Sequence, residues 1–131
     1  MFNKKKQPLI KSLIAQGTQI TGNLSFTDGF RVDGEITGDV IAVAGQPSML
    51  VISDSALVTG SICADHIILN GHVIGPVRAN ILLELQPKAR IEGDVHYAAL
   101  EMHQGALVAG QLRPDVMDEE KPTLKLAANN L

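Results

Sequence analysis

The sequence predicts an all-β protein built as a single-stranded parallel β-helix of about six coils. Two short frames predict this fold, because they recur in alternation along most of the chain and turn-prone residues separate them. Composition agrees with the prediction. Aromatic residues make up only 3% of the 131 residues, so Ile, Val, Leu and Ala must fill the core, as suits stacked strands.

The first frame has glycine at its centre and reads aliphatic, any residue, Gly, any residue, aliphatic. Its copies are ITGNL, ITGDV, VTGSI, VIGPV, IEGDV and VAGQL, which begin at Ile20, Ile36, Val58, Val73, Ile91 and Val108. The spacings of 16, 22, 15, 18 and 17 residues are too short for a unit that buries its own apolar face. One coil of a β-helix suits them, because each coil is covered by its neighbours.

The second frame reads aliphatic or Phe, any residue, aliphatic. Its copies are Phe30 to Val32, Leu50 to Ile52, Ile67 to Leu69, Leu83 to Leu85 and Leu100 to Met102. In a β-helix, equivalent positions of successive coils lie about 4.8 Å apart and form columns. We therefore expect an inward aliphatic column beginning at Ile20 and an outward hydroxyl column of Thr21, Thr37 and Thr59.

Corners and ends complete the predicted architecture. The spacing of 22 contains AGQPS, residues 44–48, which we expect to form an enlarged corner. Residues 8–16, PLIKSLIAQ, have the pattern of an amphipathic helix, but Ile14 precedes Ile20 by six residues, as Ile52 precedes Val58. We therefore expect a strand there. The prediction is a flexible tail at 1–11, a β-helix domain at 12–113 and a flexible tail at 114–131.

Charge and cysteine content narrow the function classes. A net charge of −3 argues against a general nucleic-acid-binding protein, which usually carries a basic excess. The one cysteine, Cys63, permits no internal disulfide and favours a reducing compartment. No apolar run approaches the length of about 18 residues that spans a membrane, and no signal peptide is recognisable. We expect a cytoplasmic protein.

The histidines do not form a predicted metal site. His66, His72, His96 and His103 fall in four different columns, so no two stack directly. We expect solvated strand and corner residues rather than zinc ligands acting with Cys63, which shares a column with Arg78 and His96.

Carboxylates and glycines do not predict catalysis either. Asp39 and Asp94 share a column but lie three coils apart, roughly 14 Å, which is too far for glycoside hydrolysis. GEITGD and GHVIGP lack the lysine and the following helix of a phosphate loop. Gly34 and Gly38 are better explained by tight turns and close contacts between coils. We expect no catalytic residue, metal or cofactor, and no enzyme.

Two alternatives stay open at this stage. A hexapeptide acyltransferase also builds a β-helix, but it needs 18 residues per coil and an aliphatic residue at every sixth position. Only one spacing here is 18, and steps of six from Ile36 reach Ala42 and Ser48. The second alternative is a monomeric β-helix that serves as a binding module.

The repeated ITGDV and IEGDV frames, GTQITGNL at 17–24, LNGHVIGPV at 69–77 and the MFNKKK start together resemble the bactofilins, polymer-forming cytoskeletal proteins of bacteria. The resemblance covers residues 12–113 and the first six residues. It implies a right-handed β-helix that assembles end to end into non-polar, nucleotide-independent filaments. It further implies attachment to the inner face of the cytoplasmic membrane and a scaffold role for cell-shape or cell-wall machinery. The 44–48 corner departs from the family pattern.

The ends of the solenoid are the expected polymer interfaces, because the chain shows no obvious cap over its open strand edges. Contacts of like end on like end, or of first coil on last, both continue into a filament. The residues that we expect in these interfaces are Leu13, Ile14, Ile20, Leu24, Phe26, Phe30, Leu100, Met102, Leu107, Val108 and Leu112.

The N-terminal residues Met1, Phe2, Lys4, Lys5 and Lys6 are the expected membrane contacts. Burial of Phe2 in the lipid interface contributes about 2 kcal/mol, and each lysine near anionic lipid about 1 kcal/mol. The sum of about 5 kcal/mol is weak for one chain. A filament presents many tails and gains avidity.

Overall fold

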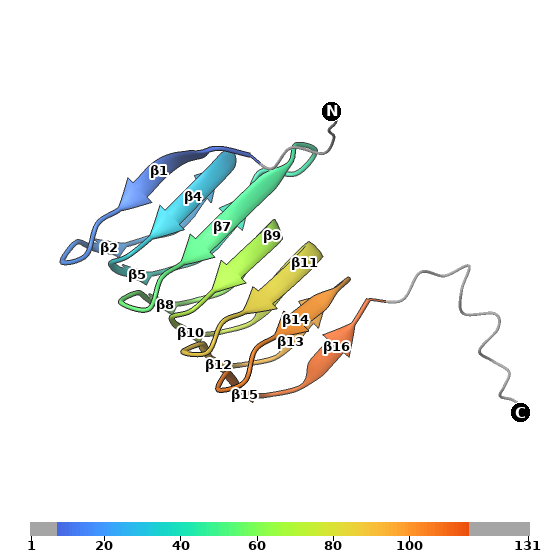
Figure 1. The fold of residues 1–131 in the computed structure, drawn as a ribbon. Helices are drawn as coiled ribbons and strands as arrows, with labels where there is room; N and C mark the ends of the chain where they lie inside the picture. The colour runs from blue at the N-terminus through green and yellow to red at the C-terminus, as the bar shows by residue number, and fades with distance from the viewer. Residues whose placement is uncertain (1–7, 116–131) are drawn as a thin grey trace, which may run out of the picture.

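The computed structural model describes residues 8–115, which form a parallel β-helix without any helical segment (Figure 1). This confirms the predicted fold class. The strands are β1 (Ile10–Ile14), β2 (Gln19–Thr21), β3 (Leu24–Phe26), β4 (Asp28–Val32), β5 (Glu35–Thr37), β6 (Val40–Ala42), β7 (Ser48–Ile52), β8 (Leu57–Thr59), β9 (Ile62–Leu69), β10 (His72–Ile74), β11 (Val77–Leu85), β12 (Arg90–Glu92), β13 (Val95–Tyr97), β14 (Leu100–Met102), β15 (Leu107–Ala109) and β16 (Leu112–Pro114).

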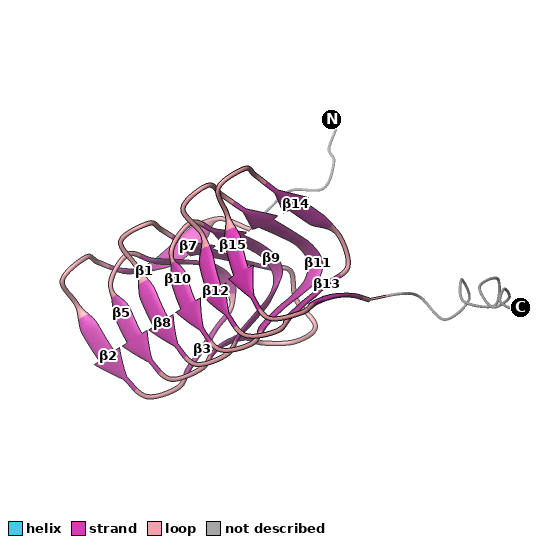
Figure 2. Ribbon diagram, turned by 90° about the horizontal axis from the view of Figure 1, so that it is seen from below, coloured by secondary structure: helices cyan, strands magenta, loops and turns pink. Residues whose placement is uncertain are grey.

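Three strand segments form each coil, and the coils stack as parallel rungs (Figure 2). One lateral face is the six-stranded sheet β15-β12-β10-β8-β5-β2. The other two faces belong to one ten-stranded sheet, because β9 and β11 each continue around a corner and pair with strands of both faces. The six strands of the smaller sheet correspond to the six copies of the glycine frame.

The strand register confirms the predicted columns. Residues Ile20, Ile36, Val58, Val73, Ile91 and Val108 are paired in succession from β2 to β15. The second frame is also in register, from Phe30 and Val32 on β4 to Leu100 and Met102 on β14. Thr21, Thr37 and Thr59 likewise stack in one exposed column.

The core is one aliphatic cluster that runs along the axis of the helix. Val58, Ile67 and Leu83, from consecutive coils, have no exposed surface. Full burial of such a side chain contributes about 1.5–3 kcal/mol, and every coil supplies several. Because each coil buries its apolar residues against the next, stability depends on continued stacking.

Glycine is required where adjacent coils turn at the same corner. The backbone φ is +150° at Gly38 and +152° at Gly60, a region that other residues rarely adopt. A Cβ atom at Gly60 would lie 2.2 Å from the carbonyl oxygen of Gly38 in the preceding coil, and one at Gly38 would lie 2.1 Å from that of Gly22. The glycine frame therefore encodes the close approach of coils at this corner.

Next to this glycine column, side chains accept hydrogen bonds from the following coil. The backbone N–H of Asp39 donates to Asn23 Oδ1, and that of Ser61 donates to Asp39 Oδ1, both at 2.9 Å. At the far end, the N–H of Gln111 donates to Asp94 Oδ1 at 3.0 Å. These contacts satisfy corner N–H groups that no strand pairing reaches.

The N-terminal segment is a strand, in agreement with the sequence prediction against a helix. Strand β1 begins at Ile10, two residues before the expected start of the β-helix, because the N–H of Gly29 donates to Leu9 O at 2.9 Å and pairs this segment with β4. The enlarged corner lies between β6 and β7, at residues 43–47. Among residues 8–115, no helix is long and apolar enough to cross a membrane.

Candidate functional site: the two ends of the β-helix

The first and last coils each leave three strands with an open edge. In the described part of the chain, β1, β2 and β3 have partners only in the second coil, and β14, β15 and β16 only in the fifth. The two sets lie at opposite ends of the stack (Figure 1). Open edges present unpaired backbone N–H and C=O groups, which favour pairing with another strand.

The N-terminal end exposes part of the core cross-section. Ile14, Ile20 and Leu24 come from β1, β2 and β3, are half-buried and pack on the core cluster. Leu13, which is also predicted to lie in the interface, belongs to the outward column with Arg31 and is exposed on a lateral face. Leu13 therefore lies at the rim of the end.

Two predicted interface residues belong to the core below the N-terminal end. Phe26 and Phe30 are only 8% and 5% exposed, and their ring centroids lie 5.2 Å apart. Phe30, predicted to lie in the interface, belongs to the second coil, because β4 pairs Phe30 with Ser12 of β1. The two rings support the end from within and offer little surface to a partner.

The C-terminal end exposes the equivalent cross-section. Met102 and Leu112 are 45% and 42% exposed although they occupy inward columns, and Leu100 and Val108 are half-buried against the core. Leu107 lies in the outward column with Arg90, so it also belongs to the rim.

The same columns run from one end to the other. The column of Ile14 ends at Met102, that of Ile20 ends at Val108, and that of Leu24 ends at Leu112. Both ends thus present aliphatic groups at matching positions, and another coil placed on either end would continue the columns.

Two ion pairs near the C-terminal end lie along the side of the stack. Arg113 Nε lies 3.3 Å from Asp94 Oδ2, and Arg78 Nη1 lies 3.2 Å from Asp115 Oδ2. The hydrogen bond from the N–H of Gln111 and the neighbouring Arg113 hold the pKa of Asp94 below its ordinary value. Arg78 and Arg113 belong to one outward column, so these pairs lie beside the aliphatic cross-section of the end and not in it.

The remaining sequence candidates do not assemble into a reactive site. No two histidines stack in the observed register, as expected. Cys63, Arg78 and His96 do share one column. Burial raises the pKa of the Cys63 thiol and outweighs the opposing effect of Arg78, so the thiolate is disfavoured.

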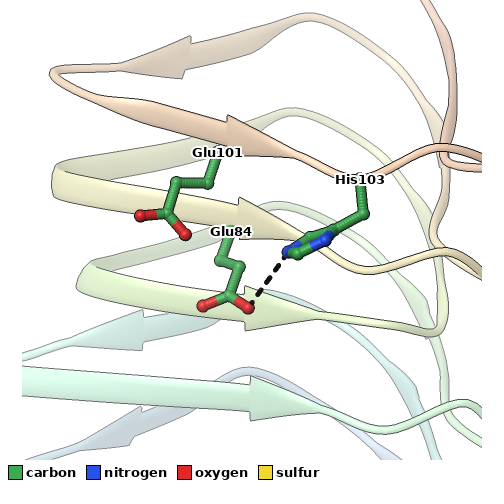
Figure 3. A group of neighbouring side chains, drawn as sticks. All are labelled: Glu84, Glu101 and His103. Atoms are coloured by element: carbon green, nitrogen blue, oxygen red, sulfur yellow. Dashed lines mark ion pairs between the residues drawn. The ribbon is translucent and has the colours of Figure 1, made fainter.

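One group of potential metal ligands was not predicted from the sequence. Glu84 and Glu101 stack in register on β11 and β14, and His103 lies beside them (Figure 3). The signal was present in the second frame, where LEL and LEM align Glu84 with Glu101. His103 follows β14 and lies outside the frame, so the alignment does not place it beside Glu84.

The predicted membrane contacts, Met1, Phe2, Lys4, Lys5 and Lys6, lie outside the described residues, as does most of the C-terminal tail.

Comparison with protein-family models gives a match over residues 12–113 to the family described as Bactofilin: polymer-forming cytoskeletal. The match includes every strand except the first residues of β1 and the last residue of β16. Neither the curated proteins nor the solved structures yielded a match to the chain.

Proposed function

We propose, since the chain belongs to the bactofilin family of polymer-forming cytoskeletal proteins, that it assembles end to end into filaments without a nucleotide. One observation supports this proposal above the others: the aliphatic core columns reach both ends, and no described segment covers them. A water-soluble solenoid that functions as a monomer usually has polar caps at these positions.

The energetics favour association at the ends. Met102 and Leu112 keep nearly half of their surface, so covering each contributes about 1 kcal/mol. Pairing of three open strand edges adds backbone hydrogen bonds worth about 0.5–1.5 kcal/mol each. A second molecule stacked on the end would provide both the apolar burial and the backbone hydrogen bonds. Because each molecule has two such ends, association does not close and continues into a filament.

A charge placed in the end tests the proposal. In the Leu112→Glu variant, the carboxylate would be buried without a partner, at a cost of about 3–5 kcal/mol, or two to four decades in the association constant. Leu24→Glu would bury an unpaired carboxylate at the opposite end and weaken association there by a similar amount. We expect both variants to stay in the supernatant on ultracentrifugation while the wild-type protein sediments, and to keep the circular dichroism of a β protein.

Ile81→Glu is the matched control, since Ile81 is 60% exposed on a lateral corner of the fifth coil. It introduces the same charge and removes a larger exposed apolar group than Leu112→Glu does. We expect this variant to sediment like the wild-type protein. Filaments of normal length in the double variant Leu24→Glu/Leu112→Glu would disprove assembly through the ends.

We further propose that the filament is peripherally attached to the inner face of the cytoplasmic membrane through the N-terminal tail, residues 1–11, with Met1, Phe2, Lys4, Lys5 and Lys6 as the contacts. The support is the chemistry of Phe2 and the three lysines, together with the avidity of a polymer. Co-sedimentation with anionic vesicles should be lost on deletion of residues 2–6. It should also weaken in Leu112→Glu, which keeps the tail but presents it singly. Equal binding by the deletion variant would refute the attachment.

The proposed cellular role is a scaffold for cell-shape or cell-wall machinery, with cell-wall enzymes or other morphogenetic proteins as further partners. Family membership supports this role, and assembly through the ends keeps three lateral faces accessible. In cells that lack the protein, wild-type chain and Ile81→Glu should restore normal shape, whereas Leu112→Glu should not. Full restoration by Leu112→Glu would show that the role does not need the polymer.

A further inference from the structure

The outward face of the last two coils carries three potential metal ligands in one place. Glu84 on β11 and Glu101 on β14 are paired in register, and His103 follows β14 directly. One ligand atom from each of the three lies within 4.8 Å of the others. Figure 3 shows the three side chains on adjacent rungs, with the imidazole beside the Glu84 carboxylate. We propose that Glu84, Glu101 and His103 bind one zinc ion.

The distances suit this metal. His103 Nε2 lies 3.4 Å from Glu84 Oε2. In a tetrahedral zinc site with bonds of 2.0–2.1 Å, two ligand atoms lie about 3.4 Å apart. The carboxylate of Glu101 needs only a side-chain rotation to complete the set, because its ligand atom already lies within 4.8 Å of the other two.

The backbone holds the ligands on a rigid support. Pairing of β11 with β14 places Glu101 directly beside Glu84. The N–H of His103 donates to Leu85 O at 2.9 Å, which fixes the start of the imidazole side chain relative to β11. A hydrogen bond from Gln86 Nε2 orients the Glu84 carboxylate. A site built on strands in this way loses little conformational entropy when the metal binds.

Charge favours a cation at this position. Two carboxylates directly opposite each other on neighbouring strands repel. Within residues 8–115, no lysine or arginine pairs with either one; Glu84 contacts His103 and Gln86, and Glu101 has no ion pair. A divalent ion would remove this repulsion. Another His–Glu contact, His72 Nε2 to Glu92 Oε2 at 2.8 Å, has no third ligand among residues 8–115 and is therefore a natural control.

The ligand set selects the metal class. Magnesium and calcium prefer sites made entirely of oxygen ligands, whereas an imidazole nitrogen with two carboxylates suits zinc. Three protein ligands leave the fourth position for water. Because Glu101 and His103 belong to the last coil and Glu84 to the fifth, the bound ion would tie the open end to the coil beneath it. This inference stands whether or not the protein forms filaments.

Zinc binding can be measured on the untagged full chain by competition with a chromophoric zinc indicator. We expect one site per chain, and no displacement of zinc by a tenfold excess of magnesium. His103→Gln and Glu101→Gln should each weaken binding by at least about tenfold, since even the loss of an outer-shell contact costs that much. His72→Gln should bind as the wild-type protein does.

A structural readout accompanies the affinity. Zinc should slow hydrogen exchange of the β14 amides in the wild-type protein and in His72→Gln, but not in His103→Gln. Circular dichroism of the metal-free variants establishes that they fold. Absence of a stoichiometric site in the wild-type protein would overturn the proposal. So would His103→Gln binding as tightly as wild type, or an equal loss in His72→Gln, since either result means adventitious binding elsewhere.

Discussion

The glycine column offers a quantitative test of how the coils are held together. Gly60 and Gly22 occupy the same column, with φ of +152° and +135°. A Cβ at Gly60 would lie 2.2 Å from Gly38 O, whereas a Cβ at Gly22 would meet nothing within 4 Å because no coil lies below the first. Gly60→Ala therefore combines backbone strain with a collision between coils, and Gly22→Ala has the strain alone.

The magnitudes separate the two effects. Backbone strain of this kind costs about 1–3 kcal/mol, and it applies to both variants. Overpacking between coils adds about 1–3 kcal/mol, because the backbone of the preceding coil has to move. We expect Gly22→Ala to lower the free energy of unfolding by about 1–2 kcal/mol and Gly60→Ala by about 2–5 kcal/mol.

The assay is denaturant unfolding followed by circular dichroism, with both substitutions made in the Leu112→Glu background so that assembly does not contribute. The difference of about 1–3 kcal/mol between the two variants is the cost of the collision between coils. If the two variants lose the same stability to within about 0.5 kcal/mol, contact between coils does not determine the glycine at this position.

Three further predictions follow from the same structure. In the otherwise wild-type chain, Gly22→Ala should reduce sedimentation more than its small effect on folding explains, because a second molecule covering the first coil would meet the new Cβ. Stability should fall as pH drops through the lowered pKa of Asp94, and this fall should be smaller in Asp94→Asn, whose amide still accepts from the N–H of Gln111. Ser48→Ala should cost about 1–2 kcal/mol, because Ser48 is 3% exposed and its Oγ accepts from the N–H of Asp65 at 2.9 Å.

A specific experimental result would contradict each of these three predictions. Normal sedimentation of Gly22→Ala would mean that no backbone approaches the first coil in the polymer. Because its pKa is lowered in the folded protein, the ionised Asp94 carboxylate stabilises the fold at neutral pH, and this stabilisation is lost when the carboxylate is protonated in acid. If stability falls equally with pH in Asp94→Asn, the Asp94 carboxylate is not the cause of the fall. For Ser48, the exposed Ser25→Ala on β3 is the control, and equal losses in the two variants would exclude the buried hydrogen bond.

Most of the architecture could be predicted, because the sequence repeat determines where the strands lie and how they pair. Two frames determine which residues stack, and the observed register places Val58 on Ile36 and Leu83 on Ile67 as the sequence indicates. Strand β1 was also predictable from the single interval between Ile14 and Ile20. A period of this kind constrains the register strongly, since a shift of one residue would turn the aliphatic column outward.

The site was less predictable, because apolar identity alone does not say which way an end residue points. Leu13 and Leu107 lie in outward columns, and Phe30 belongs to the second coil because β4 pairs it with Ser12 of β1. The group of Glu84 and His103 depends on where the chain leaves β14, which the spacing of frames does not specify. Columns predict neighbours between coils well, and they predict neighbours around corners poorly.

The central claim is that coils continue from one molecule into the next, and the axial repeat of the filament tests it most directly. Six coils at about 4.8 Å give an axial length of about 29 Å per molecule, or about 58 Å for the repeat if like ends meet. Cryo-electron microscopy of the purified wild-type protein without nucleotide should show filaments with one of these repeats and strands perpendicular to the filament axis. Only monomers at every concentration, or filaments with the β-helices lying crosswise, would contradict the account.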